Sequence, residues 1–225
     1  FDNLTSGTYN AYAVVYDVAG NSQQSETIDI KLGTVVKPSG ATASPTTWTN
    51  GNVTVTLPTQ SGYTTQYQTG STSGSWSTYS SSKKPTVSSN TTVYYRYNDG
   101  TNAGSYGSIA ISNIDKTKPT ISTALNSSSV TTKGFTLNIG VTDPSSGLSK
   151  IVWYYKLSTA STYTSATNEY TAMNGSTAGT KTAVTKSRAI TNLTSGTYNA
   201  YAVVYDVAGN SQQSETIDIK LGTVV

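Results

Sequence analysis

The sequence contains a long internal repeat, and this repeat limits the possible architecture more than any other feature. Residues 3–36 and residues 192–225 are identical at 34 of 34 positions, at an offset of 192 − 3 = 189 residues. Many repeated positions are Ser, Gln or Thr, where surface substitutions usually cost little stability. Structural constraint alone therefore does not explain the identity, and we infer a recent duplication in a parent protein built as a tandem array. The period is too long for one solenoid repeat of about 20–50 residues and suits a pair of β-domains.

The repeat divides the chain into three parts. Residues 1–36 are predicted to be the last strands of a preceding copy, residues 37–117 a complete domain, and residues 118–225 a second domain that ends in the second copy of the repeat. Pro38 and Pro119 mark the two seams and disfavour helix there. We expect short linkers with limited bending, and a chain that is an interior segment of a longer protein.

Composition excludes several classes of function. Ser (33) and Thr (41) together occupy 74 of 225 positions, only 11% of residues are charged, and Cys and His are absent. The chain therefore has no disulfide framework, no zinc–thiolate site and no Cys nucleophile. It also lacks the commonest general base near neutral pH. The net charge of +3 comes from scattered basic residues, which does not favour nucleic-acid binding. No apolar run approaches the roughly 20 residues that would insert into a membrane.

Hydrophobic patterning predicts strands throughout. Residues 52–57, 134–139 and 151–157 alternate with a period of two, and no segment carries apolar residues at helical spacing. Thr, Val and Tyr favour a pleated surface. Short strands separated by frequent turns are typical of all-β sandwiches.

Two motifs point to a known family. Residues 193–198 (LTSGTY) are followed by an alternating strand and then by residues 206–210 (DVAGN), and residues 91–100 carry a variant of this signature in the first domain. Residues 48–55, at the start of the first domain, form a further segment with a family resemblance. These segments resemble bacterial immunoglobulin-like and fibronectin type III repeats of large cell-surface proteins. The resemblance implies tandem β-sandwiches joined by short Pro-containing linkers. Such sandwiches serve many unrelated functions.

The same resemblance assigns structural roles. Counting back in steps of two from Asp206 gives the core-facing positions of the strand and ends on Tyr198, which would be the corner tyrosine whose hydroxyl binds the backbone upstream. Gly209 belongs to the turn after Asp206. We also assign structural roles to Trp153 and Trp48.

The opposite side of the same strand is a candidate binding surface. Tyr201, Val203 and Tyr205 are predicted to point outward, and Tyr94 and Arg96 lie on the corresponding face of the first domain. Tyr is enriched at interfaces. In the alternative interpretation, exposed aromatic residues only pair across the sheet, which contributes about 0.2–1 kcal/mol per pair.

Metal and catalytic sites find little support in the sequence. Asp115, Asp143 and Asp206 suggest calcium, which binds six to eight oxygens. However, the chain has eleven acidic residues and no Asp-x-Asp, and turn chemistry explains Asp143 and Asp206 equally well. No pair of carboxylates indicates a glycosidase, and no nucleophile elbow is present. We predict no catalytic residues, no bound metal, no cofactor and no enzymatic activity.

These observations predict a repeat segment of a bacterial cell-surface protein, extracellular in location, that acts as a stalk or as an adhesin module. Alternatively, the domains bind a host protein directly (an immunoglobulin, mucin or matrix protein) or a glycan. In a third interpretation the chain is a carbohydrate-binding accessory module of a secreted glycanase, which a catalytic domain elsewhere in the parent protein would favour.

The N-terminal copy of the repeat poses a separate question. A two-stranded hairpin alone is marginal in water, and residues 1–36 lack the strands that would cover their apolar edge. We therefore expect this segment to be disordered, clipped or engaged in strand exchange with another copy of the chain.

Overall fold

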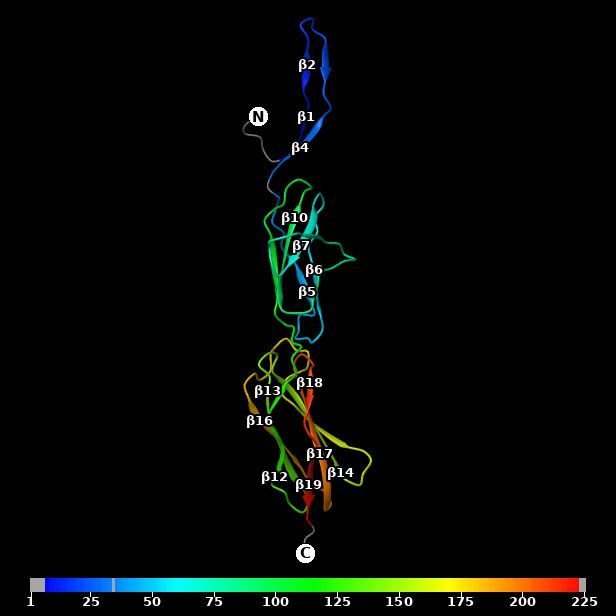
Figure 1. Cartoon of the computed structure of the whole chain (residues 1–225), viewed down its shortest axis with the longest axis vertical. Coiled ribbons are helices and arrows are strands. Elements are labelled where there is room, and N and C mark those ends of the chain that lie inside the picture. Colours follow the sequence, from blue (N-terminus) through cyan, green and yellow to red (C-terminus); the bar gives the residue numbers. More distant parts are fainter. Residues whose placement is uncertain (1–6, 34, 223–225) are drawn as a thin grey trace. The chain divides into compact units, whose positions relative to one another are not determined.

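Strands, turns and loops make up the part of the chain that the structure describes. The computed structural model describes residues 7–33 and 35–222, and no helix occurs among them (Figure 1). The predicted all-β class is therefore confirmed, and no helix in this part of the chain could span a membrane. The described residues form two compact units: the first contains residues 7–33 and 35–41, Leu57–Lys83 and Val93–Ser108, and the second contains Thr42–Thr56, Lys84–Thr92 and residues 109–222.

The first unit contains two short strand pairs and most of a four-stranded sheet. The strands are β1 (Gly7–Ala11), β2 (Val14–Tyr16), β3 (Ser22–Gln24), β4 (Ile28–Leu32), β7 (Thr64–Thr69), β8 (Ser77–Thr78), β10 (Thr91–Asn98) and β11 (Gly107–Ile111). β1 pairs with β4, β2 pairs with β3, and the larger sheet has the order β11-β10-β7-β8. All pairs with a defined register here are antiparallel.

Strand β10 shows how the sequence places side chains on this sheet. Val93, Tyr95 and Tyr97 are buried, whereas Tyr94 and Arg96, on the opposite face, are half-buried. This alternation follows from the two-residue period of a pleated strand. The sequence therefore separates a buried face from an outer face.

The second unit contains a three-stranded sheet and a complete sandwich. The strands are β5 (Thr42–Ser44), β6 (Val53–Thr56), β9 (Thr86–Val87), β12 (Thr120–Ser128), β13 (Phe135–Thr142), β14 (Leu148–Leu157), β15 (Thr164–Glu169), β16 (Val184–Ile190), β17 (Gly196–Asp206), β18 (Ser211–Gln213) and β19 (Ile217–Leu221). The small sheet has the order β5-β6-β9.

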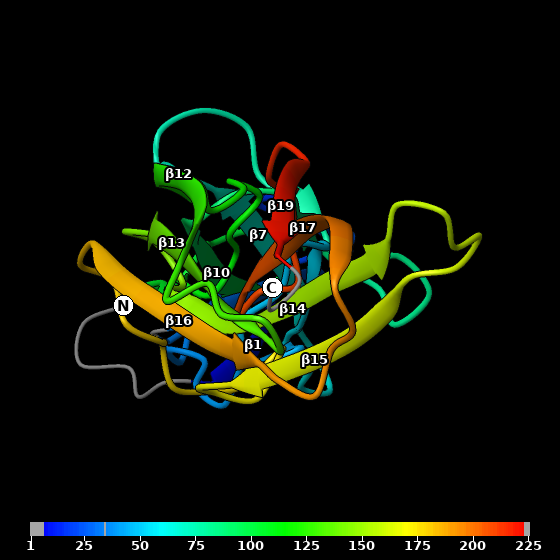
Figure 2. The ribbon, with the colours of Figure 1, turned by 90° about the horizontal axis from the view of Figure 1, so that it is seen from below.

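Two antiparallel sheets form the sandwich (Figure 2). One has the order β12-β13-β16, and the other has the order β15-β14-β17-β18, with β19 also paired to β17. β17 lies between β14 on one side and β18 and β19 on the other. This is a sandwich of the predicted immunoglobulin-like or fibronectin III-like class.

The sandwich core draws its side chains from both sheets. Leu137 and Ile139 of β13 and Trp153 and Val204 of the other sheet are fully buried in one apolar cluster. The Trp153 Nε1 donates to the Asn168 Oδ1 at 2.9 Å, so its polar atom is satisfied. Burying a large apolar side chain contributes about 1.5–3 kcal/mol, and these residues hold the two sheets together.

The expected seams fall where the chain has no strand. Residues 33–41, as far as they are described, and residues 112–119 connect β4 to β5 and β11 to β12. The second compact unit also takes in residues 42–56 and 84–92. The domain boundaries at residues 37 and 118 therefore stay a prediction.

Candidate functional site

The outer face of β17 carries the residues that we predicted to point outward. Tyr201, Val203 and Tyr205 are half-buried, while the residues between them are fully buried. Tyr201 is paired with Tyr154 of β14, and their rings stack with centroids 4.7 Å apart and an interplanar angle of 13°. The outer face is thus partly covered by its own side chains.

A third ring and two ammonium groups extend this cluster. The ring of Tyr163 meets that of Tyr201 edge-on at 4.9 Å. The Lys156 Nζ lies 5.1 Å from the centroid of the Tyr163 ring, and the Lys150 Nζ lies 5.1 Å from that of Tyr205. Burial raises the pKa of Tyr201, and the neighbouring phenols raise it further. Such contacts stabilise a sheet, and Tyr163 stays 37% exposed.

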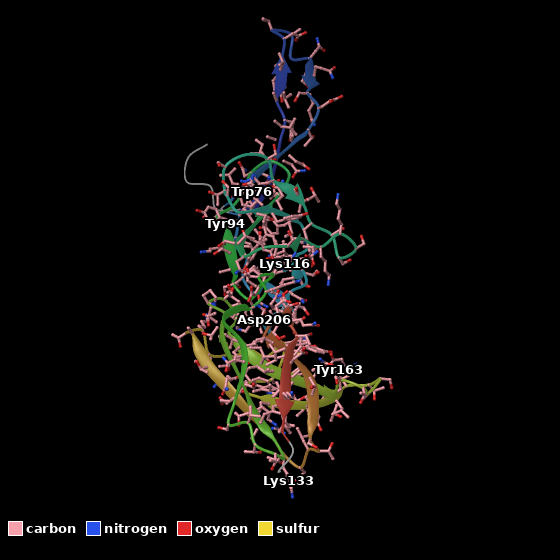
Figure 3. The ribbon with its side chains drawn as sticks, turned by 60° about the horizontal axis from the view of Figure 1, so that its bottom comes forward. Trp76, Tyr94, Lys116, Lys133, Tyr163 and Asp206 are labelled. Atoms are coloured by element: carbon pink, nitrogen blue, oxygen red, sulfur yellow. The ribbon has the colours of Figure 1, made fainter. Side chains whose placement is uncertain are left out.

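The other two predicted binding residues, Tyr94 and Arg96, belong to a cluster in the first unit, where Figure 3 labels Tyr94 and Trp76. The Arg96 guanidinium carbon lies 4.1 Å from the centroid of the Trp76 ring, and its Nε donates to the Gln66 Oε1 at 2.9 Å. Tyr106 is 47% exposed, and its ring meets Tyr94 edge-on at 5.5 Å. Sequence reasoning missed Trp76 and Tyr106, because both lie in loops; the one signal for Trp76 is a large aromatic residue in a Ser- and Gly-rich segment.

The predicted structural residues have identifiable contacts. The buried Tyr198 donates its hydroxyl to the Thr194 carbonyl at 3.1 Å, as expected of a corner tyrosine. Gly209 has φ +100°, a conformation that favours glycine. Trp48 is half-buried, its backbone N–H donates to the Gly175 carbonyl at 2.9 Å, and the Lys181 Nζ lies 5.4 Å from its ring centroid. Trp153 is the core residue described above.

Three buried aspartates from separate segments meet at one end of the sandwich, where Figure 3 labels Asp206. Asp115 follows β11, Asp143 follows β13, and Asp206 ends β17. One carboxylate oxygen of each lies within 4.8 Å of those of the other two, and the residues are 3%, 1% and 0% exposed. Sequence reasoning named these residues but did not predict that they meet. We call them the aspartate cluster.

Two of these carboxylates accept hydrogen bonds within turns, which is the alternative that the sequence offered for them. The Asp143 Oδ1 accepts the backbone N–H groups of Ser145 at 3.1 Å and Gly147 at 2.8 Å. The Asp206 Oδ1 accepts those of Gly209 at 2.6 Å and Asn210 at 2.7 Å. These bonds fix where each carboxylate points, so turn chemistry also aligns the cluster.

Asp115 is held by residues that sequence reasoning did not single out. Its Oδ2 accepts from the Ser146 backbone N–H at 3.0 Å and from the Ser146 hydroxyl at 2.6 Å. The Asn210 Nδ2 donates to the Asp115 carbonyl at 2.9 Å and to the Asp206 Oδ2 at 2.7 Å. Ser146 and Asn210 therefore connect three chain segments.

The electrostatics of the aspartate cluster are unfavourable without a proton or a cation. Burial raises the pKa of Asp206 to about 6, and hydrogen bonds from Asn210 and Gly209 oppose this shift. Burial also raises the pKa of Asp143; the backbone hydrogen bond from Gly147 lowers it, and the negative charge of Asp115 raises it further. Among the residues that the structure describes, no lysine or arginine forms a hydrogen bond or an ion pair with any of the three carboxylates.

Comparisons with known proteins bear on the fold only. No known protein family and no curated protein matches the chain. Similar solved structures include a titin segment (11% identity, TM-score 0.45, covering 93% of this chain and 82% of that one). A two-domain fibronectin type III segment of chicken tenascin is 18% identical with a TM-score of 0.31, covering 83% and 99%. The chicken interferon gamma receptor alpha chain is 14% identical with a TM-score of 0.34, covering 84% and 100%. At these identities and TM-scores, no functional inference follows.

Proposed function

We propose that this chain is a repeat segment of a bacterial cell-surface protein and acts as an extracellular stalk. The path of the chain through the sandwich that contains the second copy of the repeat supports this proposal. Asp115, just before the first strand β12, lies beside the C-terminal end of β17 at Asp206. The last strand, β19, ends at Leu221 beside Gly196, at the other end of β17.

This path lets each sandwich add length to an array. The ten residue steps from Gly196 to Asp206, at about 3.3 Å each, correspond to about 33 Å. The chain therefore enters at one end of the sandwich and leaves at the other. Together with the 189-residue duplication, this favours units joined in series.

The hydroxyl-rich composition is consistent with a stalk. Charged residues make up only 11% of the chain, so few long-range charge interactions would pull neighbouring units together. Repetition also multiplies weak contacts into avidity if each unit binds a partner.

The test is an array of one to four 189-residue units measured by small-angle scattering and by single-molecule stretching. We expect the maximum dimension to grow by a constant increment per unit, and stretching to give one family of equal unfolding steps for each sandwich type. Arrays whose maximum dimension does not grow with unit number would contradict the stalk. Antibody labelling of intact source cells tests the location separately.

The tyrosine-bearing face supports a second candidate function, direct binding of a host protein or glycan. Tyr154, Tyr201 and Tyr163 form a group of contacting rings flanked by Lys156, and one ring of the group is exposed. Amphipathic rings of this kind suit both protein surfaces and sugars.

Binding of the full chain to immunoglobulins, mucins, matrix proteins and glycans tests this candidate. A Tyr201→Ser, Tyr205→Ser variant should lose binding if the outer face of β17 is the site, and a Tyr94→Ser variant tests the corresponding face of the first unit. A partner bound by both variants as tightly as by the wild type would place the site elsewhere. No binding in single units and arrays alike would leave only the stalk.

A further inference from the structure

The aspartate cluster places formal negative charge in a dry environment. Asp115, Asp143 and Asp206 contribute three carboxylates, all nearly inaccessible to solvent. Buried charges in proteins are normally paired or bound to metal ions, and like charges at this separation disfavour ionisation. Hydrogen bonds to backbone N–H groups offset part of this cost but add no positive charge.

A second observation points to a ligand. The Asp143 Oδ2 is buried and accepts no hydrogen bond, although the Oδ1 of the same carboxylate accepts two. Asp143 is 1% exposed. Buried polar atoms almost always have a partner, and leaving one without any costs about 1–3 kcal/mol or more for a charged group. This buried oxygen without a partner belongs to one of the three carboxylates of the aspartate cluster.

We propose that Asp115, Asp143 and Asp206 together bind one calcium ion. The donors are all oxygens, as a hard cation requires, and the chain has no His or Cys that would favour zinc. Two oxygens each about 2.4 Å from one Ca²⁺ are at most about 4.8 Å apart. The three carboxylate oxygens all lie within 4.8 Å of one another, so one ion could contact all three. Three ionised carboxylates would neutralise the +2 charge of the ion and leave one negative charge.

The physical environment favours calcium over magnesium. Mg²⁺ demands near-octahedral geometry and usually keeps several of its waters. Residues that are 0–3% exposed leave little room for a hydrated ion, and their orientation is set by turns rather than by an octahedral arrangement. Ca²⁺ accepts irregular oxygen sets and is more easily dehydrated.

The ion would join segments that are distant in the sequence. Asp143 and Asp206 belong to the sandwich, whereas Asp115 belongs to the segment between β11 and β12. The Asp115 backbone N–H donates to the Thr49 carbonyl at 2.9 Å, and the Asn113 Nδ2 donates to the Thr47 carbonyl at 2.6 Å. A bound ion would therefore hold residues 47–49 and 113–115 against the sandwich turns.

The test is calcium binding by the full chain, first stripped with a chelator, measured by titration calorimetry and by thermal unfolding. We expect saturable binding of one Ca²⁺ and a rise in the Tm of the sandwich in excess calcium, because a ligand that binds only the native state stabilises it. Asp143→Asn should weaken the Kd by about a hundredfold or more, since even losing an outer-shell partner costs 10–100-fold.

Two controls separate a cation site from general damage. In chelator, Asp143→Asn should be at least as stable as the wild type, because it removes one of three clustered charges; in calcium it should be less stable. Asp17→Asn is the matched control for Asp206→Asn, since both positions have identical neighbours at an offset of 206 − 17 = 189 residues but Asp17 is exposed.

Several results would overturn the proposal. They are an unchanged Tm on adding calcium, an equal Kd in wild type and Asp143→Asn, or an equal loss of binding in Asp17→Asn and Asp206→Asn. Magnesium that binds and stabilises as well as calcium would overturn the choice of ion. The stalk proposal would stand in each case, because array length measures it independently.

Discussion

Two regions of this molecule have the same sequence and different surroundings. Residues 7–32, the N-terminal copy, form β1 to β4, and residues 196–221, the C-terminal copy, form β17 to β19. Their strand pairings correspond: Gly7 lies opposite Leu32 as Gly196 lies opposite Leu221. The difference in strands is continuity, because β17 is unbroken where the N-terminal copy has two shorter strands.

Local hydrogen bonds are also the same in both copies. The Asn21 N–H donates to the Asp17 Oδ1 at 2.8 Å, and the Asn210 N–H donates to the Asp206 Oδ1 at 2.7 Å. Gly20 and Gly209, which lie between the Asp and the Asn of each copy, have φ +92° and +100°. An Asp that binds backbone N–H groups a few residues on is a local device, so it forms without the rest of the sandwich.

Burial separates the two copies. Val15 is 70% exposed and its counterpart Val204 is 0% exposed, while Ile30 and its counterpart Ile219 are 41% and 3% exposed. The C-terminal copy is covered by β14 and the facing sheet. This sequence therefore forms a hairpin by itself but becomes part of a core only where other strands cover it.

Val204→Asp and Val15→Asp place the same charge in the two copies and should have the most different effects. We expect Val204→Asp to reduce the free energy of unfolding of the sandwich by at least about 4 kcal/mol, because it buries a charge without a partner. The same change at the exposed Val15 should stay within about 0.5 kcal/mol. Urea unfolding followed by tryptophan fluorescence measures both. Equal effects would show that the N-terminal copy has its own partner strands in solution, as strand exchange predicts.

Amide hydrogen exchange compares one hydrogen bond in the two settings. The Ala202 N–H donates to the Ser214 Oγ at 3.0 Å, and the Ala13 N–H donates to the Ser25 Oγ at 2.9 Å. We expect Ala202 to exchange about a thousandfold more slowly or better, since a core strand opens with nearly the global stability and an uncovered hairpin does not. Comparable protection at high dilution would contradict this.

The aromatic stack offers a smaller test. A double-mutant cycle of Tyr154→Leu and Tyr201→Leu should give a coupling energy of about 0.5–1.5 kcal/mol, as for other stacked pairs. Tyr12, the counterpart of Tyr201, is 58% exposed, and its substitution by Leu should leave the stability of the sandwich unchanged. A coupling near zero would mean that the stack does not stabilise the sheet, which would favour a binding role.

The pKa values of the two matched aspartates, Asp17 and Asp206, should be shifted in opposite directions. Hydrogen bonds from Asn21 lower the pKa of Asp17, whereas burial raises the pKa of Asp206 to about 6. In calcium-free protein, the contribution of Asp206 to stability is fully present below the pKa of about 3.9 that an Asp has in the unfolded chain. It is lost as the pH rises through the folded-state pKa of about 6. The Asp17 contribution is present above that unfolded value and is lost as the pH falls through the lowered pKa.

Carboxyl carbon NMR measures both titrations. The two groups differ only in their tertiary surroundings, so equal pKa values in chelated protein would contradict the buried placement of Asp206. Calcium should then abolish the Asp206 titration near pH 6 without affecting that of Asp17.

Much of the fold could be predicted from sequence. The alternation in residues 52–57, 134–139 and 151–157 corresponds to strands β6, β13 and β14, although β13 and β14 extend further than the predicted segments. Parity also separates the buried Tyr198 from the half-buried Tyr201. Both signals are local, because a pleated strand repeats every two residues.

The candidate sites were less predictable for a physical reason. Asp115 and Asp143 are 28 positions apart and Asp206 lies 63 further on, and no local pattern indicates that β13 and β17 end beside the segment after β11. The stacking of Trp76 on Arg96 likewise joins a loop to a strand. Such contacts depend on sheet order and loop path rather than on sequence spacing.

The strands, the turns and the internal repeat follow from the order of the amino acids alone. This order also determines the local hydrogen bonds of Asp17 and Asp206, because these features depend on neighbours within a few residues. In contrast, long-range packing sets which copy of the repeat is buried and which aspartate lies beside two others. Burial and charge clustering come from segments far apart in the chain, so one 34-residue sequence has an exposed carboxylate in one place and contributes to a proposed calcium site in the other.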